Sequence, residues 1–449
     1  MTVADRSVSP AYDESTSSLD RIADGEQPAR WTPAQLIGFR FLFAYFVLYD
    51  APSLLGSIPV VGVIAQPVYG ALQWMAIWTG VHILHLAGPI IVAPTGSGDT
   101  MKDYVMNLVM FVLAAIAAVV WSAADRKRVQ YRMLYEWLRI IVRFALAFIM
   151  FGYGFAKVFP NQFPQPTLER LVEPLGDFSP MGLLWTFMGY SFAYNIFTGL
   201  GESVGALLLC ARRTTTAGAL LLITVLSNVV ILNFTYDVPV KIFSANLLLM
   251  AIFLAAPDMP RIVNLIVRHR RTEPSPIKPV FATPAMHRTS MVLRALLVAW
   301  VLFGNVTSGN ARFVSSGPNA PKPPLYGIYD VQAVNRNGHD VPLVITDSSL
   351  WKRVVFSQFD RVSVRTMTDS LSRYAVAVDS VHHTLLLTPR FDSRAKLTLE
   401  YTRPATDRLV LAGRVGRDSI SATFKRIDET KYLLMSRGFH WVQEQPFNR

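Results

Sequence analysis

Cysteine is nearly absent from this chain, because Cys210 is the only one among 449 residues. A single thiol excludes intramolecular disulfides, CxxC redox pairs and metal sites built from several thiolates. Charged residues are scarce as well, at 16% of the composition, whereas 51% of the residues are hydrophobic. With a mean hydropathy of +0.32, this composition predicts an integral membrane protein rather than a soluble domain.

Motifs for nucleotide binding and hydrolysis are missing too. The loop 93–103 is rich in Gly, Ser and Thr, but it has no GxxxxGK[ST] phosphate-binding pattern. No Ser–His–Asp arrangement stands out from the sequence. The formal net charge is +12, yet most basic residues lie beside hydrophobic segments, where they set membrane orientation. We therefore expect the lipid bilayer, and no nucleic acid, as a partner.

Apolar runs long enough to cross a bilayer recur between residues 35 and 306. A helix of about 20 residues spans about 30 Å of hydrocarbon. We predict a polytopic α-helical membrane bundle of about seven spans plus one re-entrant or interfacial helix, followed by an all-β meander domain. The predicted spans are 34–55, 103–124, 132–157, 181–210, 214–234, 240–256 and 289–306.

Basic residues fall in alternate gaps between these spans, and this pattern predicts the orientation. Lys and Arg concentrate at 125–132, at 212–213 and at 261–271, whereas the gaps between these are acidic or neutral. The positive-inside rule places the basic gaps in the cytoplasm. An odd number of crossings then puts a disordered tail, residues 1–30, in the cytoplasm. The carboxyl-terminal domain lies in the periplasm, outside a bacterial inner membrane.

The stretch 68–86 is long enough to cross the membrane, but a crossing there would invert the amino terminus. Its tryptophans and histidines favour an interfacial or re-entrant helix on the outer side, with a crossing as the alternative. His82 and His85 are spaced to share a helical face, which makes them weak candidates for metal ligands. No third ligand is evident nearby, so we expect no metal site.

Composition also marks the domain boundaries. From Leu325 onward, short segments with alternating apolar residues are separated by turn signals. This pattern predicts an antiparallel meander that closes into a barrel or packs as a sandwich, either as a stable module or as a lipocalin-like ligand pocket. The predicted divisions are membrane helices at 31–131, a four-helix unit at 132–270, linkers at 271–288 and 307–324, a last helix at 289–306 and the β domain at 325–449.

Ionisable residues inside the predicted spans are candidates for a site, because each costs about 2.5–3.5 kcal/mol at mid-membrane without a partner. Glu136, Arg139 and Arg143 lie on one face of the span 132–157. We expect Glu202, in the following span, to pair with Arg143 or Arg139. Such a pair either fixes helix register or forms a substrate or proton site.

A second polar set is expected toward the outer face of the membrane. Donors and one pair of opposite charges would converge there, which suits the headgroup of an amphiphile such as a quinone. Ordinary snorkelling and interfacial anchoring explain the same pattern. The members of this set are Lys157, Asn228, Asn233, Tyr236, Asp237, Lys241 and Asn246.

The region from about 132 to 256 resembles the DoxX family of four-helix bacterial membrane proteins. The resemblance rests on YGFAK at 153–157 and on GESVGALLLCARRTTTAGAL, which begins at Gly201. It implies interest in Lys157 and Glu202, and an association with redox partner proteins, since some DoxX relatives are subunits of a thiosulfate:quinone oxidoreductase. The chain has no flavin, haem or iron–sulfur signature, so a quinone, and no covalently bound group, is the cofactor that the resemblance implies.

Three functions are compatible with these features. The resemblance and the outer polar set favour a quinone-associated subunit of a membrane redox system. The lack of a complete catalytic constellation favours a non-enzymatic assembly or scaffold protein. A small-molecule transporter would need polar residues along a path, which Arg143, Glu202 and Asn228 could begin, but no inverted repeat is detectable.

Overall fold

The computed structural model describes residues 30–448 except 57–58, 89, 273–282 and 391–394. The chain forms two compact units, the first from residues 1–145 and 256–288 and the second from residues 146–255 and 289–449. Helix α5 passes from one unit to the other, so the predicted boundary at residue 132 is not where the units divide. The predicted tail at 1–30 lies almost entirely outside the described residues.

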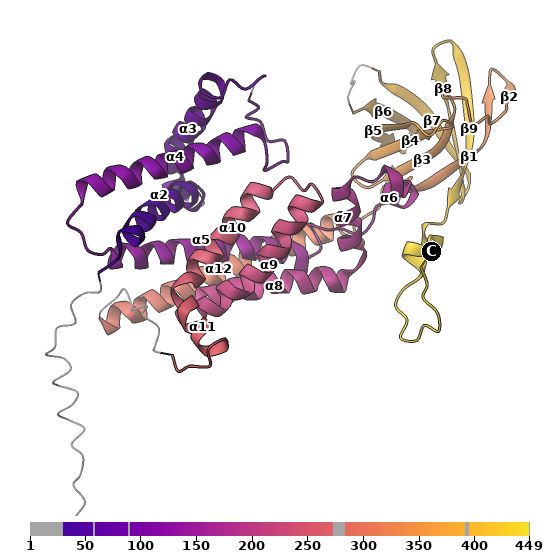
Figure 1. Cartoon of the computed structure of the whole chain (residues 1–449). Helices are drawn as coiled ribbons and strands as arrows, with labels where there is room; N and C mark the ends of the chain where they lie inside the picture. Colours follow the sequence, from indigo (N-terminus) through magenta and orange to yellow (C-terminus); the bar gives the residue numbers. More distant parts are fainter. Residues whose placement is uncertain (1–29, 57–58, 89, 273–282, 391–394, 449) are drawn as a thin grey trace, which may run out of the picture. The chain divides into compact units, whose positions relative to one another are not determined.

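The first unit is helical (Figure 1). A capping box begins α4, because the Thr100 hydroxyl accepts from the Asp103 amide and the Asp103 carboxylate accepts from the Thr100 amide. The predicted interfacial stretch 68–86 covers the second half of a longer helix, α3, as far as His82, and its last four residues lie beyond that helix. The 24 residues of α3 are enough for a crossing as well. The helices are α2 Pro33–Gly56, α3 Pro59–His82, α4 Met101–Ala124, the start of α5 Arg132–Val158, and α11 Met259–Ile266.

The second unit contains the rest of the bundle and the β domain. The helices of this unit are α5, α6 Leu168–Val172, α7 Pro180–Tyr190, α8 Phe192–Cys210, α9 Thr215–Thr235, α10 Lys241–Ala255 and most of α12 Pro284–Ser316.

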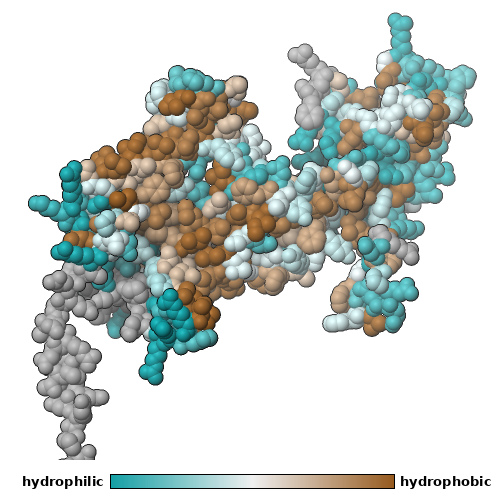
Figure 2. Space-filling view, in the orientation of Figure 1, coloured by the Kyte–Doolittle hydropathy of each residue, from teal (hydrophilic) through white to brown (hydrophobic). Residues whose placement is uncertain are grey.

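Among the described residues, six helices of the whole chain are long and apolar enough to cross a membrane, which confirms a membrane protein. Figure 2 shows hydrophobic side chains over the outer surface of these helices, while hydrophilic residues cover much of the β domain.

Three predicted boundaries are wrong. Most of the predicted linker 271–288 lies outside the described residues, and the helix after it, α12, begins at Pro284 rather than at 289. The predicted span 181–210 is two helices, because Ser191 has an extended backbone and caps α8 with its hydroxyl. The predicted linker 307–324 is helical as far as Ser316, because α12 continues to that residue. The bilayer-spanning part of this region is therefore α8 alone, and α12 carries the chain well beyond the predicted last span.

The β domain is a closed antiparallel barrel, which confirms the predicted meander and selects the barrel over the sandwich. Strands β3 to β9 follow β1 in sequence order, and β9 pairs back to β1 to close the ring. Buried side chains such as Tyr329, Leu385 and Phe424 fill its interior, which favours the stable module over a lipocalin-like pocket. The strands are β1 Gly327–Arg336, β2 His339–Val341, β3 Trp351–Ser357, β4 Arg361–Thr366, β5 Leu371–Asp379, β6 Thr384–Pro389, β7 Leu397–Ala405, β8 Arg408–Val415 and β9 Asp418–Ile427.

Glycines allow a close contact between α5 and α8. A Cβ on Gly199 of α8 would lie 2.6 Å from the Gly154 carbonyl oxygen of α5, and a Cβ on Gly154 would lie 2.8 Å from the Gly199 carbonyl oxygen. Backbone atoms cannot give way as side chains do, so only glycine allows this approach. Small residues are the usual means by which membrane helices come this close. The contact fixes which residues of α5 and α8 face each other.

Candidate functional site

Lys157 and Glu202 form a buried ion pair at this contact between α5 and α8. The Lys157 Nζ donates to both carboxylate oxygens of Glu202, at 2.8 Å and 2.7 Å. Lys157 is 6% exposed and Glu202 is 3% exposed. Each charge lies inside a helix bundle where water cannot solvate it, so each depends on the other. The pair neutralises its own charge and leaves one N–H of the ammonium for another acceptor.

Aromatic rings surround the ammonium group. The Lys157 Nζ is 5.6 Å from the centre of the Tyr153 ring and 5.9 Å from that of Phe163, both within the range of cation–π attraction. Tyr153 in turn contacts Phe243 of α10, with ring centres 6.0 Å apart. These contacts connect the ion pair on α5 and α8 to the hairpin of α9 and α10.

Several polar atoms beside the pair have no hydrogen-bond partner among the described residues. The Asn195 side chain donates from Nδ2 to the Phe163 carbonyl oxygen at 2.9 Å, which fixes the amide orientation and leaves a buried, unpaired Oδ1. The Ser203 Oγ is also buried without a partner and lies against Gly154. An unpaired buried polar atom is costly, so these atoms fit a site that receives a polar ligand or a water molecule.

The predicted outer polar set is only partly brought together. Asn233 donates to the Ser244 Oγ at 3.0 Å, and Lys241 pairs with Asp237 at 2.9 Å. Tyr236 packs against the buried cluster that contains Phe163, which joins it to the surroundings of Lys157. Asn246 is buried and donates to the Ile242 carbonyl oxygen.

Two members of the set point elsewhere. Asn228 is exposed on α9, and the Asp237 side chain is 84% exposed. The Lys241–Asp237 pair is therefore a surface ion pair, which contributes little to stability. The predicted convergence holds for Lys157 and Tyr236, which both lie at the cluster that contains Phe163, and fails for Asn228 and Asp237.

The predicted partner of Glu202 is wrong, since its carboxylate pairs with Lys157 rather than with Arg143 or Arg139. The prediction compared how deep the charged residues lie in the membrane. It counted residues from the cytoplasmic ends of the spans 132–157 and 181–210 and treated each span as one continuous helix. The break at Ser191 and the glycine contact instead place Glu202 beside the last turn of α5. Lys157, assigned to the outer set, is the residue that this register brings to Glu202.

The remaining members of the predicted charged face belong to the first unit. Arg139 and Arg143 are buried, and Glu136 is half-buried. The Arg139 guanidinium lies 5.8 Å from the Tyr135 ring centre, and that of Arg143 lies 4.9 Å from the Phe144 ring centre. Both arginines are thus held against aromatic rings of their own helix.

The histidine pair does not have the expected geometry. His82 is the last residue of α3, where its Nδ1 is 3.0 Å from the Trp78 carbonyl oxygen and its ring stacks on Trp78. His85 lies beyond the helix with a φ of +48°. The two residues therefore do not share a helical face, and the premise of the metal-ligand hypothesis is wrong.

A buried network around Arg40 was missed from the sequence. Its guanidinium donates to the Ser122 Oγ at 2.8 Å, to the Asp125 carbonyl oxygen at 2.9 Å and to the Tyr131 hydroxyl. The Tyr131 hydroxyl donates to the Asp125 carboxylate at 2.8 Å. The sequence did contain a signal for this network, because an arginine inside the apolar run 34–55 requires hydrogen-bond partners. This network ties α2 to the end of α4 within the first unit.

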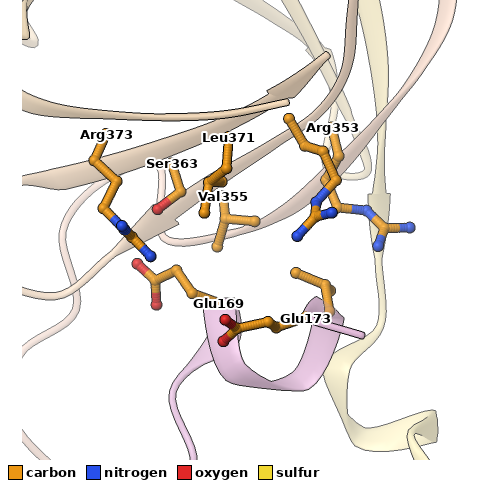
Figure 3. A pocket seen from close by; sticks show the side chains of 9 residues that line it. Glu169, Glu173, Arg353, Val355, Ser363, Leu371 and Arg373 are labelled. Atoms are coloured by element: carbon orange, nitrogen blue, oxygen red, sulfur yellow. The ribbon is translucent and has the colours of Figure 1, made fainter. Parts of the chain in front are cut away.

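A second polar site lies where α6 meets the barrel wall (Figure 3). Leu168 of α6 packs against Ile328 and Val355 of the barrel. Around this apolar contact the Arg373 side chain points toward the Glu169 carboxylate. The lining combines basic Arg353, Arg365 and Arg373 with acidic Glu169 and Glu173.

Two of the basic side chains of this groove are paired with carboxylates that lie next to it. Arg353 donates two hydrogen bonds to the Asp330 carboxylate, and this bonding raises the pKa of the Arg353 guanidinium. Arg365 lies 3.9 Å from the Asp177 carboxylate. Because Arg353 and Arg365 are already paired with carboxylates and Leu168 packs on the barrel wall, the groove suits the docking of α6 against the barrel. It is a weaker candidate for a ligand site than the Lys157–Glu202 cluster.

Comparison with known proteins finds a relative that is itself uncharacterised. The uncharacterised protein YwoB of Bacillus subtilis is 35% identical to this chain over 123 residues, which are 27% of this chain and 78% of YwoB. No family model matches the chain, and no solved structure matches it.

Removing one member of the ion pair should destabilise the bundle strongly. Lys157→Met leaves an unpaired buried carboxylate, so we expect a loss of about 3–5 kcal/mol. In the double variant Lys157→Met/Glu202→Leu the uncompensated charge is gone, and stability should return most of the way. The midpoint of thermal unfolding in detergent, measured for the two single variants and the double variant, tests this.

Lys241→Met is the matched control, because it breaks an ion pair whose carboxylate is exposed. Its effect should stay within about 0.5 kcal/mol. If Lys157→Met/Glu202→Leu lost as much stability as Lys157→Met and Glu202→Leu lose together, the two charges of the buried pair would not depend on each other.

Proposed function

This chain belongs to the same family as YwoB, which is uncharacterised, so we propose from its geometry that it is a quinone-associated subunit of a membrane redox system. The observation that carries this proposal is the buried Lys157–Glu202 pair with unpaired polar atoms of Asn195 and Ser203 beside it. Charged side chains are rare inside membrane bundles, and those that occur there serve structure, binding or proton transfer. The resemblance of this region to DoxX proteins supports the same assignment.

The residues of the cluster fit a quinone headgroup chemically. The Ser203 hydroxyl and the remaining Lys157 N–H are donors suited to a carbonyl oxygen, and the Asn195 Oδ1 is an acceptor suited to a hydroxyl. The rings of Tyr153 and Phe163 offer apolar faces next to these groups. A bound quinone supplies two-electron redox chemistry coupled to proton exchange. Glu202, held by Lys157, is the carboxylate of this cluster that is positioned to take up or release a proton.

The proposal includes a location and an orientation. We place the protein in a bacterial inner membrane, with its amino terminus in the cytoplasm and its barrel in the periplasm. The support is the concentration of Lys and Arg at 125–132, 212–213 and 261–271. In this orientation the Lys157–Glu202 pair lies toward the periplasmic face, where a redox partner protein would dock.

A scaffold function is the second candidate, and one observation favours it. The barrel interior is filled with side chains, and α6 is docked to its wall through an apolar contact. A filled, firmly held barrel suits the presentation of a surface to another protein. In that case the Lys157–Glu202 pair would serve only to fix α5 against α8.

Native mass spectrometry of the purified full-length protein tests the redox proposal. We expect a bound quinone at about one per chain, and a loss of at least about fivefold in Ser203→Ala, since one hydrogen bond is worth about 1 kcal/mol. This variant should keep its fold because the Ser203 Oγ has no partner among the described residues. Asn228→Ala, at an exposed position of α9, should bind quinone as the unaltered protein does.

Absence of quinone, or equal quinone in all three proteins, would contradict the redox proposal. A protein partner bound in stoichiometric amount to a quinone-free preparation would favour the scaffold candidate.

The orientation is tested by labelling cysteines in intact cells with a membrane-impermeant maleimide, in a Cys210→Ser background. A cysteine at Val381, an exposed residue between β5 and β6, should react in intact cells. A cysteine in place of Ser7 should react only after lysis. Reaction at both positions in intact cells would show an even number of crossings, with α3 among them. Reaction at Val381 only after lysis would overturn the proposed orientation.

A further inference from the structure

The segment after the last strand of the barrel exposes large apolar side chains to an unusual degree. It follows η4 Glu429–Lys431, begins with α13 Leu433–Ser436 and continues to residue 448. Trp441 is 90% exposed, Phe439 76% and Val442 75%. Single exposed apolar residues are ordinary, but a cluster of this kind within a few residues marks an interaction surface. We call residues 433–448 the carboxyl-terminal segment.

Contacts within the segment hold these side chains outward. The rings of Phe439 and Trp441 meet edge to face, with centres 5.0 Å apart. On the other side the Arg437 guanidinium lies 4.6 Å from the Phe447 ring centre and donates to the Gln443 side chain. The segment is thus folded on itself around Arg437, and its Phe439–Trp441 pair is preformed at the surface.

Strand pairing determines the end of the barrel from which this segment leaves. Ile427 at the end of β9 is paired with Ile328 at the start of β1. The chain reaches β1 from α12, which ends at Ser316, through a connection of ten residues. Tyr432 also packs against the cluster formed by Leu168 of α6 and Ile328. The carboxyl-terminal segment therefore leaves the barrel at the end that faces the membrane helices.

The bilayer lies within reach of this end. Helix α12 has 33 residues, of which about ten follow the predicted span 289–306, so it extends about 15 Å beyond the hydrocarbon core on the barrel side. Phe439 lies about 12 residues past the end of β9, and seven of them are in η4 and α13. With about 1.5–2 Å per helical residue and about 3.3 Å per extended residue, this stretch reaches at most about 30 Å. Figure 1 shows the segment hanging clear of the barrel wall rather than folding over it.

We propose that the carboxyl-terminal segment is an interfacial membrane anchor, which inserts Phe439, Trp441 and Val442 into the headgroup region of the bilayer that the helices cross. Tryptophan favours this region, because its ring is apolar and its N–H finds polar partners there. The segment carries one basic side chain, Arg437, and one acidic side chain, Glu444, apart from His440. Apolar contact rather than net charge drives the insertion, so it does not require anionic lipid.

The consequence for the protein is a second attachment of the barrel. One attachment is the docking of α6 through Leu168, and the other is the bilayer itself. With both in place, the barrel end that faces the membrane is fixed over the outer ends of the helices of its own unit.

Fluorescence of the full-length protein in vesicles tests the anchor. A Val442→Cys variant in a Cys210→Ser background carries an environment-sensitive dye, and the vesicles are phosphatidylcholine with or without a spin-labelled lipid quencher. We expect quenching of at least about twofold, and equal quenching when anionic lipid is added. The same dye at Val381, 83% exposed on the β5–β6 turn, is the matched control and should not be quenched.

A second variant separates anchoring from chance proximity. Phe439→Ala/Trp441→Ala in the labelled Val442→Cys protein should abolish the quenching, while the elution volume in size-exclusion chromatography stays unchanged. Quenching that survives this change, or that equals the Val381 control, would overturn the proposal. A dye shielded from aqueous iodide but not quenched by the lipid would show that a protein covers the segment, and would overturn it as well.

Discussion

The ion pair between Lys157 and Glu202 is the interaction on which the second unit depends. Neither charge can lie alone inside the bundle, because an unpaired charge there costs several kcal/mol. The pair forms only if α5 and α8 approach closely, and Gly154 and Gly199 permit that approach by having no side chains. The ion pair and the close glycine contact between α5 and α8 therefore depend on each other. Together they set the register of the two helices.

This register determines the surroundings of the pair. It brings the Ser203 hydroxyl against Gly154, and the hydrogen bond from Asn195 draws the loop at Phe163 over the end of α8. The rings of Tyr153 and Phe163 then flank the ammonium group. Beyond this loop the chain forms α6, which docks on the barrel through Leu168. A continuous series of contacts within one unit thus runs from the buried charges to the β domain.

The sequence predicted the parts of the fold that depend on local pattern. Apolar runs of bilayer length became helices, and alternating segments from Leu325 onward became a barrel, because hydrophobic period reports local structure directly. The partner of Glu202 could not be predicted in the same way. It depends on a helix register set by Gly154 and Gly199, and no hydropathy pattern records such a contact. The break at Ser191 was not predicted either, because it lies within a long apolar run that reads as one span. Arg40 was detectable as a charge in a predicted span, but its partners at Ser122 and Tyr131 come from distant parts of the chain.

The most direct test of the account is photolabelling of the full-length protein in membranes with a photoreactive quinone analogue, followed by mapping of the labelled peptides. The account predicts that labels concentrate in residues 153–163 and 195–203, and that excess unmodified quinone competes with them. Labels confined to the bilayer-facing surface of α12, or insensitive to competition, would contradict a quinone site at the Lys157–Glu202 pair.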